Sequence, residues 1–393
     1  MIKNKKNTCS ACGTSPVNHN LFFVLNLLDE TLGKIDIKFL KFASTNRGRE
    51  VFSYIEKLIY NFFHFIGFVR YSNNIEKAIT GRSKLIWEEA KKRSIKMEQI
   101  VLFGKYIEFY RAKINGKMFY FQSLPIPPWL PQDGYDWLDD KFTLFEKLSL
   151  NKIPVPGTKK ISSLKEARAS FKELRKPVII KPKCGSRGRH TTTNIKTEED
   201  LINAYNVSRE ITLYMVMQEH LFGSVYRATL VNNKLVGFFK ADPPKITGDG
   251  NKNIKNLIIE RNKQHVEKIS EILVKDDLIN FIKRQGYDLN TILPSGMTID
   301  LSAKVGRMYG GYTKEMLDDV HPKMHSIFEK AGSIVEGPVV GFDLIIEDPT
   351  KDPDNQRWGI IECNSMPFID LHYFAFEGKR TNLAINVWDL WNK

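Results

Sequence analysis

The chain contains few cysteines, and they do not form a disulfide framework. Only four occur in 393 residues: Cys9 and Cys12 form a CxxC pair, whereas Cys184 and Cys363 stand alone far downstream. A structural zinc site usually needs four ligands, and the nearby third candidate is His19. We therefore expect Cys9 and Cys12 to be reduced surface thiols, and the protein to be cytoplasmic.

The sequence also lacks a hydrophobic run long enough for a transmembrane helix. The strongest candidates, residues 21–28 (LFFVLNLL) and 58–71 (LIYNFFHFIGFVRY), fall well short of the roughly 20 apolar residues that such a helix requires. The first run has no small-residue cleavage site and is followed directly by DET, which argues against a signal peptide. We expect the second run to be buried in an N-terminal core, with an interfacial helix as the alternative.

Acidic residues are outnumbered, with 45 against 59 basic residues and a formal net charge of +14. Such an excess suits an anionic partner, although a lysine-rich surface explains it equally well. Lys and Arg are dispersed without a recognisable reading module, so we expect no nucleic-acid partner. The hydrophobic content of 42% is typical of a folded globular protein, and the length suggests two or three lobes.

Strands and helices alternate along the chain, so the fold class is α/β or α+β. The sequence predicts a helix over residues 83–95, and Asn115-Gly116 between two alternating apolar runs predicts a β-hairpin. A second hairpin is expected around Asn232-Asn233, a capped helix at Thr197, and a long helix over residues 252–273. Apolar runs at 176–183, 213–221, 339–348 and 357–364 predict strands.

Residues 178–190, VIIKPKCGSRGRH, combine an apolar run with two glycines and four cations. Backbone N–H groups near Gly185 and Gly188 can approach phosphate oxygens closely because glycine has no Cβ, and Lys181 adds a positive charge. The stretch matches neither GxxxxGK[ST] nor GxGxxG. Taken in isolation, it is better interpreted as a solvated turn.

A second group of residues gives a more specific signal, which is that of a metal site. Asp343 lies in GFDLIIED, and Glu362 and Asn364 lie in IIECN, where period-two alternation points the latter two to one face. Their oxygen donors suit Mg²⁺. Because both carboxylates are embedded in apolar runs, burial without a partner or metal would be costly, which favours a metal site over two surface carboxylates.

The order of these features resembles that of ATP-grasp enzymes, and most of all the ATP-grasp part of cyanophycin synthetases and related carboxylate–amine ligases. KPKCGSRGRH is similar to their KP-x-x-G-x-x-G-R pattern, and residues 246–262 are similar to their GDG-x-x-x-I-x-x-LI-x-x-x-N segment. The resemblance implies two α+β lobes that clasp ATP, preceded by an N-terminal α/β substrate-side domain. We expect a chain of this length to lack the Mur-ligase-like half of a full cyanophycin synthetase.

We also expect a division of the chain into four parts, of which the resemblance does not cover the first. These are a helical, aromatic-rich region (1–75), a pre-ATP-grasp-like segment (76–130), a central lobe with a phosphate flap (131–222) and a C-terminal lobe with the Mg²⁺ site (223–393). The oligomeric state is left open.

Roles at single positions are likewise implied by the resemblance. The nucleotide-binding positions would be Lys141, Lys181, Gly185, Ser186, Arg187, Gly188, Gln218, Glu219 and Leu221. The positions that hold Mg²⁺, with two ions expected, would be Asp343, Glu362 and Asn364. The catalytic positions would be Lys181 at the phosphates and Arg307, our candidate for stabilising a tetrahedral intermediate.

The activity implied is ATP-dependent ligation of an amino acid or peptide. A substrate carboxylate would attack the γ-phosphate to give an acylphosphate, and an amine would then displace phosphate and form the amide bond. Three positions depart from the family: Val225 replaces an acid that binds ribose, Ser302 an arginine and Gly306 an asparagine. A catalytically impaired relative that binds nucleotide or an acidic partner is therefore the alternative. His190, in addition, replaces a glycine of the flap.

Overall fold

The computed structural model describes residues 9–12, 17–32, 46–138, 140–183, 189–264, 269–283, 285–302 and 305–392. The predictions for Gly185, Ser186, Arg187 and Gly188 fall on residues outside these ranges. All structural statements below concern the described residues.

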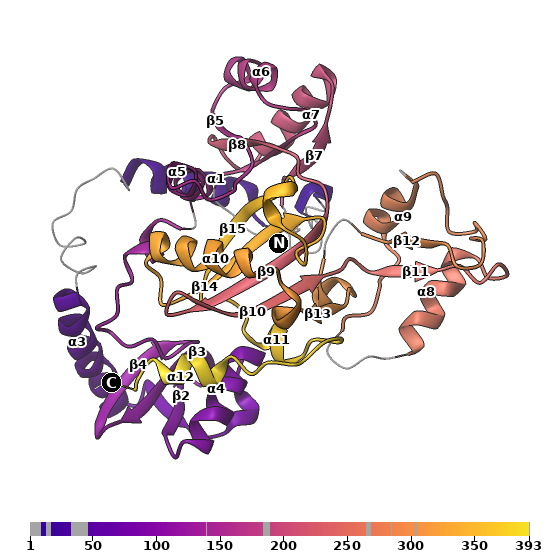
Figure 1. The fold of residues 1–393 in the computed structure, drawn as a ribbon. Helices are drawn as coiled ribbons and strands as arrows, with labels where there is room; N and C mark the ends of the chain where they lie inside the picture. Colours follow the sequence, from indigo (N-terminus) through magenta and orange to yellow (C-terminus); the bar gives the residue numbers. More distant parts are fainter. Residues whose placement is uncertain are drawn as a thin grey trace, which may run out of the picture.

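A five-stranded antiparallel sheet forms the centre of the molecule (Figure 1). Its strands, in spatial order, are β13 (Thr313–Glu315), β10 (Lys234–Ala241), β9 (Ser224–Val231), β14 (Val339–Ile346) and β15 (Gly359–Ser365). One face packs against α10 (Pro322–Val335) and α5 (Lys141–Leu150) in the largest hydrophobic core. Because side chains alternate between faces, the residues between these core positions point to the opposite face.

A second antiparallel sheet forms the lobe at the top of Figure 1. Its strands are β5 (Thr158–Ile161), β8 (Met215–Glu219), β6 (Val178–Pro182) and β7 (Thr192–Ile195), and its helices are α6 (Leu164–Glu173) and α7 (Glu198–Arg209). The two helices and one face of the sheet share a core that includes Val178, Ile180, Met215 and Met217. Thr197 begins α7 with a capping box, which confirms the predicted cap.

The third sheet lies at the opposite end of the molecule (Figure 1). Its strands are β1 (Val69–Ser72), β2 (Lys96–Leu102), β3 (Lys105–Ile114) and β4 (Lys117–Gln122), and it packs with α4 (Gly81–Lys92) and the C-terminal α12 (Ala384–Asp389). Asn115 and Gly116 both have positive φ, 48° and 78°, as the predicted hairpin requires. Because β1 pairs with β2, this unit begins before the boundary predicted at residue 76.

A smaller unit lies on the flank of the central sheet and contains α8, α9, β11 and β12 (Figure 1). Their bounds are Ile254–Lys263, Asp276–Lys283, Lys245–Thr247 and Thr298–Asp300. The long helix predicted over residues 252–273 is wrong over residues 269–273, which are not helical; α8 ends at Lys263, and residues 265–268 lie outside the described ranges. In this non-helical stretch, Ile272 packs into the hydrophobic core of the small unit.

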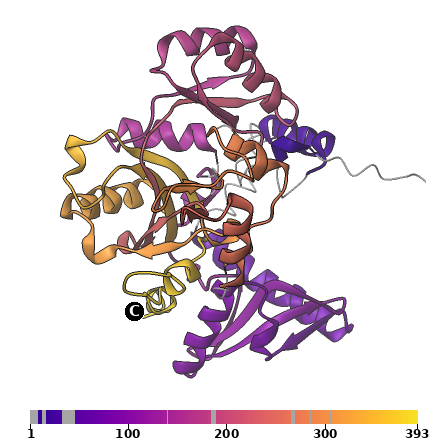
Figure 2. The same ribbon diagram turned by 90° about the vertical axis from the view of Figure 1, so that its right-hand side faces the viewer.

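The N-terminal segment packs against the upper lobe (Figure 2). It contains the short 3₁₀ turn η1 (Ser10–Cys12) and α1 (His19–Leu32), whose Phe23 ring lies 5.6 Å from the guanidinium of Arg209 at the end of α7. Cys12 is only 1% exposed, so the expectation of a surface thiol is wrong at this position.

Helix α3 (Asn46–Phe65) is anchored to the N-terminal sheet through one side only. The ring of Tyr60 stacks on Tyr120 of β4, with centroids 5.0 Å apart. Other apolar side chains of the 58–71 run are exposed, including Phe62 and Phe65, so the expected burial of the run is wrong for these residues. Among the described residues, no helix has both the length and the apolar character that crossing a membrane requires.

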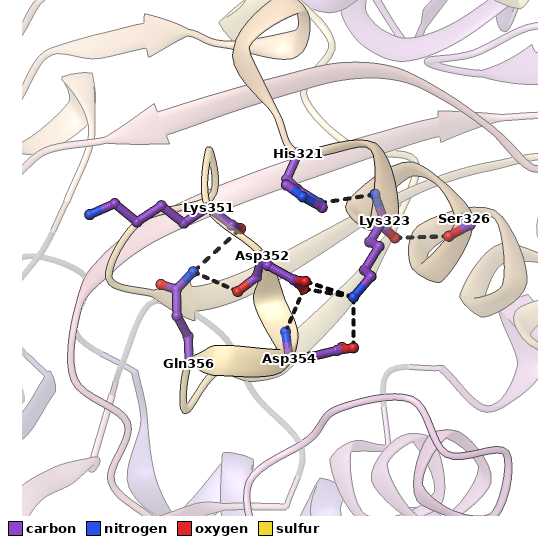
Figure 3. A network of polar contacts seen from close by, with 7 residues as sticks. All are labelled: His321, Lys323, Ser326, Lys351, Asp352, Asp354 and Gln356. Atoms are coloured by element: carbon purple, nitrogen blue, oxygen red, sulfur yellow. Dashed lines mark hydrogen bonds and ion pairs between the residues drawn. The ribbon is translucent and has the colours of Figure 1, made fainter.

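The loop between β14 and β15 is fastened to the start of α10 (Figure 3). Lys323 Nζ contacts Asp352 Oδ2 at 2.7 Å and Asp354 Oδ2 at 2.8 Å, while Gln356 Nε2 donates to the carbonyl of Asp348 at 2.8 Å. These contacts are largely exposed, so each contributes little to stability. Together they restrict the connection between the two strands on which the candidate site is built.

Tyr135 ties the segment that precedes α5 to the central sheet. Its hydroxyl donates to the carbonyl of Val339 at 2.9 Å and accepts from the N–H of the same residue at 3.0 Å. We expect Tyr135→Phe to lower the free energy of unfolding by about 2 kcal/mol, because both backbone groups lose their partner. Urea unfolding measures this loss, with Tyr373→Phe as the matched control at an exposed tyrosine. Equal stability of the two variants would contradict it.

Candidate functional site

A row of charged residues crosses three adjacent strands on the face of the central sheet opposite the α10 core. Asp343 of β14 is the register partner of Arg227 on β9 and of Glu362 on β15, so the three side chains share one face. Arg227 Nε and Nη2 donate to the two carboxylate oxygens of Asp343, each at 2.6 Å. Asn364 Nδ2 lies 3.3 Å from Asp343 Oδ2, so Glu362 and Asn364 face the same way, as the period-two pattern predicts.

A β-bulge in β15 sets the direction of Glu362. Asp343 pairs with Glu362, but its neighbour Leu344 pairs with Ile360, which leaves Ile361 as the extra residue. Ile360 can therefore enter the α10 core while Glu362 points to the opposite face. Strict alternation would place both side chains on one side of the sheet.

Two lysines from the other side of the site reach this row. On β6, Val178 and Ile180 point into the core of the upper lobe, so Lys181 points to the opposite face. Lys181 Nζ donates to the carbonyl of the bulged Ile361 at 3.4 Å, and Lys141 Nζ, at the start of α5, lies 3.8 Å from Glu362 Oε1. The upper lobe and the central sheet therefore meet where Lys181 contacts Ile361, with Lys141 close to Glu362.

Burial shifts the pKa values of one basic and one acidic group in this site, Lys181 and Glu362. Burial lowers the pKa of Lys181 to about 7, and the like charge of Lys141 adds to the effect, against the opposing carboxylate of Glu362. Burial raises the pKa of Glu362, Asp343 adds to the rise, and Lys141 is the main opposing charge. Burial of these charged groups is thus costly, and pKa values shifted in this way are typical of a binding site.

The structure places three of the predicted nucleotide-binding residues, Gln218, Glu219 and Leu221, on β8 and just beyond it. Gln218 is the register partner of Ile179, so it lies on the same face as Lys181; its Nε2 donates to Thr158 Oγ1 at 2.9 Å. Glu219 points to the other face, where its carboxylate accepts from the N–H of Arg175 at 3.1 Å and from Arg357 Nη2 at 2.7 Å. The carboxylate of Glu219 is therefore already hydrogen-bonded within the protein.

Arg307 belongs to a second polar cluster, which includes Arg82 of α4 and Asp370 of α11 (Asp370–Tyr373). Arg307 Nη2 donates to Asp370 Oδ2, and Arg82 Nη1 donates to the carbonyl of Met366, two residues after Asn364. Among the described residues, Arg82 Nε, Arg307 Nη1 and Asp370 Oδ1 are buried without a hydrogen-bond partner. Buried polar atoms of this kind, two donors and one acceptor, are costly unless a ligand completes their hydrogen bonds.

Two arginines of the site were not predicted from the sequence. Arg227 carried a usable signal, because it stands in the apolar strand SVYRATLV in the same way that Asp343 stands in VVGFDLII. Arg82 carried none: a cation in the first turn of an amphipathic helix is usually exposed, and only the packing of α4 against α11 brings Arg82 here.

The Arg227–Asp343 pair should stabilise the sheet as well as the site. The two side chains are only 15% and 17% exposed, so Arg227→Met leaves a partly buried carboxylate beside Glu362 and is expected to cost about 3 kcal/mol of folding free energy. Asp343→Asn combined with Arg227→Met should cost clearly less than the sum of the single changes. Denaturant unfolding of the four proteins of this cycle measures the coupling, and additive losses would contradict the pairing.

Comparison with known proteins bears on the sequence relationship and on the fold. No protein-family model matches the chain. A cyanophycin synthetase from Synechocystis is 29% identical over 247 residues, which are 61% of this chain and 28% of that protein. The glutathione biosynthesis bifunctional protein GshAB from Clostridium perfringens is 24% identical over 262 residues, 64% of this chain and 34% of that protein.

The crystal structure of a bifunctional glutathione synthetase from Pasteurella multocida superposes on 79% of this chain and 43% of its own, with a TM-score of 0.59 and 21% identity. The chain spans less than half the length of the curated relatives described here. The predicted α/β (α+β) class is confirmed. The chain therefore has the ATP-grasp fold and is related in sequence to cyanophycin synthetases and GshAB proteins.

Proposed function

We propose that this protein is an ATP-dependent carboxylate–amine ligase that forms an amide bond on an amino acid or a peptide. The observation that carries the proposal is the convergence of two lysines and three oxygen-donor residues where the lobes meet: Lys141, Lys181, Asp343, Glu362 and Asn364. The similarity to a cyanophycin synthetase and to glutathione biosynthesis proteins supports it. The scarcity of cysteine supports a cytoplasmic location.

The oxygen donors fit magnesium. Two carboxylates lie side by side on paired strands, and the raised pKa of Glu362 indicates a carboxyl group removed from water that a divalent cation would favour in its charged form. Asp343, Glu362 and Asn364 would hold the ion, or two ions, which would neutralise charge on the phosphate oxygens of ATP. Arg227 already holds the carboxylate of Asp343 in a defined orientation.

The chain's own residues supply position and charge, which are the main requirements of phosphoryl transfer. Lys141 and Lys181 would bind the phosphates of ATP while the substrate carboxylate attacks the γ-phosphate. The amine then attacks the resulting acylphosphate, and the carbonyl oxygen gains negative charge before phosphate leaves. The buried donors Arg82 Nε and Arg307 Nη1 are suited to a substrate carboxylate or to this oxygen, which keeps Arg307 as our candidate catalytic residue.

The competing function is nucleotide binding without ligation, and Val225 and Ser302 favour it because they replace family residues that bind ribose or substrate. The purified chain, with Mg-ATP and pools of amino acids and dipeptides, distinguishes the two. We expect ADP release that depends on one pool and a product whose mass equals the two substrates minus water. Thermal stabilisation by ATP without stimulated turnover would instead support the binding function.

The metal assignment makes a separate prediction at Glu362. Glu362→Gln keeps the size of the side chain but removes its charge, so turnover should fall by about 100-fold or more, with little loss of stability. Steady-state ADP release and thermal unfolding measure the two effects, with Glu347→Gln as the control at an exposed glutamate near the end of β14. Near-normal turnover of Glu362→Gln would refute the metal assignment.

Nucleotide binding should be coupled to proton uptake. The pKa of Lys181 is lowered to about 7, and a bound triphosphate favours its charged form, so the protein should take up a proton on binding at pH just above 7. Affinity should accordingly weaken as the pH rises above that value. Calorimetric titration in two buffers of different ionisation enthalpy measures the uptake, which Lys181→Met should abolish and Lys165→Met, an exposed change on α6, should preserve. An unchanged proton balance in Lys181→Met would contradict the assignment.

A further inference from the structure

Four metal-ligating side chains meet between the N-terminal segment and the upper lobe. Cys9 directly precedes η1 and Cys12 is its last residue, His19 is the first residue of α1, and His190 comes from the loop before β7. One ligand atom of each residue lies within 4.8 Å of those of the other three. The CxxC pair and His19 thus acquire a fourth partner that is about 180 residues distant in sequence.

The spacing of the ligand atoms suits a tetrahedral zinc ion. Cys12 Sγ lies 3.3 Å from His19 Nε2 and 3.3 Å from His190 Nε2, and Cys9 Sγ lies 3.7 Å from His190 Nε2. Ligands bound to Zn²⁺ at about 2.0–2.3 Å in a tetrahedron are separated by about 3.3–3.8 Å. Two thiolates also balance the charge of the ion, so the complete site is neutral and compatible with the burial of Cys12 and His190.

Both imidazole rings are oriented by further partners on α7 and just after it. His190 Nδ1 lies 2.6 Å from the carbonyl of Val207, which can only accept, so Nδ1 carries the proton and Nε2 presents its lone pair to the sulfur atoms. His19 Nδ1 lies 3.5 Å from the carboxylate of Glu210. Carbonyl and carboxylate partners of this kind accompany most metal-bound histidines and hold their rings in place.

The backbone at His190 gives an independent reason to expect a ligand. His190 has a φ of 49°, in the left-handed region where glycine is least strained. The conformation is held by two hydrogen bonds: its N–H donates to the carbonyl of Ala11 at 2.9 Å, and its carbonyl accepts from Ser208 Oγ at 2.6 Å. A completely buried histidine here directs its side chain at two cysteines.

We propose that Cys9, Cys12, His19 and His190 bind one structural Zn²⁺ ion. Four protein ligands leave no open position, so the ion stabilises the fold and does not take part in catalysis. It fastens the N-terminal segment to the upper lobe, because two cysteines and one histidine lie on the segment and the other histidine lies on the lobe. The proposal does not depend on the ligase function.

The test is the metal content of the untagged full-length chain, purified under reducing conditions from zinc-supplemented cells. We expect about one zinc ion per chain by elemental mass spectrometry, and below about a tenth of that in Cys9→Ser/Cys12→Ser. His190→Gly should lose zinc equally. Its backbone conformation favours glycine, so this variant separates metal loss from backbone strain. His325→Gln on α10 is the matched control and should retain the ion.

Spectroscopy and stability complete the test. Co²⁺ added to the zinc-free wild type should give the intense visible bands of a tetrahedral site and a thiolate charge-transfer band, and both should be absent in His190→Gly. A chelator should lower the melting temperature of the wild type but not that of His190→Gly. The proposal is overturned if the folded wild type binds neither Zn²⁺ nor Co²⁺, if His190→Gly retains full zinc, or if the isolated chain carries a Cys9–Cys12 disulfide, which would indicate a redox pair.

Discussion

The candidate active site depends on keeping charges of both signs in one partly dehydrated place. Arg227, Lys141 and Lys181 supply three positive charges, and Asp343 and Glu362 supply two negative charges, so the fully ionised set carries one excess positive charge. With the pKa of Lys181 near 7, the empty site can lose this excess by releasing a proton. A bound polyphosphate with its divalent cations would again favour the charged form of Lys181. Ligand binding and the ionisation of one lysine are therefore parts of the same electrostatic balance.

The sheet makes this arrangement possible because it has two unlike faces. The face toward α10 is apolar and supplies the core, and the opposite face carries Arg227, Asp343 and Glu362 in register. The bulge at Ile361 resolves a conflict between the two roles, since Ile360 belongs to the core and Glu362 to the site. It also presents the Ile361 carbonyl to Lys181, so one irregularity both aims a carboxylate and joins the two lobes.

The cysteine–histidine cluster joins the N-terminal segment to the upper lobe. Leu21 and Val24 of α1 are exposed, and α1 contacts the upper lobe near Arg209 and Glu210. A metal ion would supply a strong attachment where hydrophobic contact is limited. It would also explain why a buried histidine is tolerated at a backbone conformation that suits glycine.

Much of the local structure was predictable because its causes are local. Asn115-Gly116 encodes a tight hairpin, Thr197 caps a helix, and a charged residue inside an apolar strand, such as Asp343 or Lys181, indicates a functional face. The helix predicted beyond Lys263 failed because its apolar spacing serves the core of a small unit instead.

The sequence by itself determined which residues are candidates for the site and that Glu362 and Asn364 share one face, because alternation and the cost of burying charge act along the chain. Only the tertiary structure decided their partners. Arg227 meets Asp343 through strand register, Arg82 reaches the end of β15 through helix packing, and His190 completes the set begun by Cys9 and Cys12. Such contacts follow from how whole elements pack, which no spacing within a short stretch of sequence records.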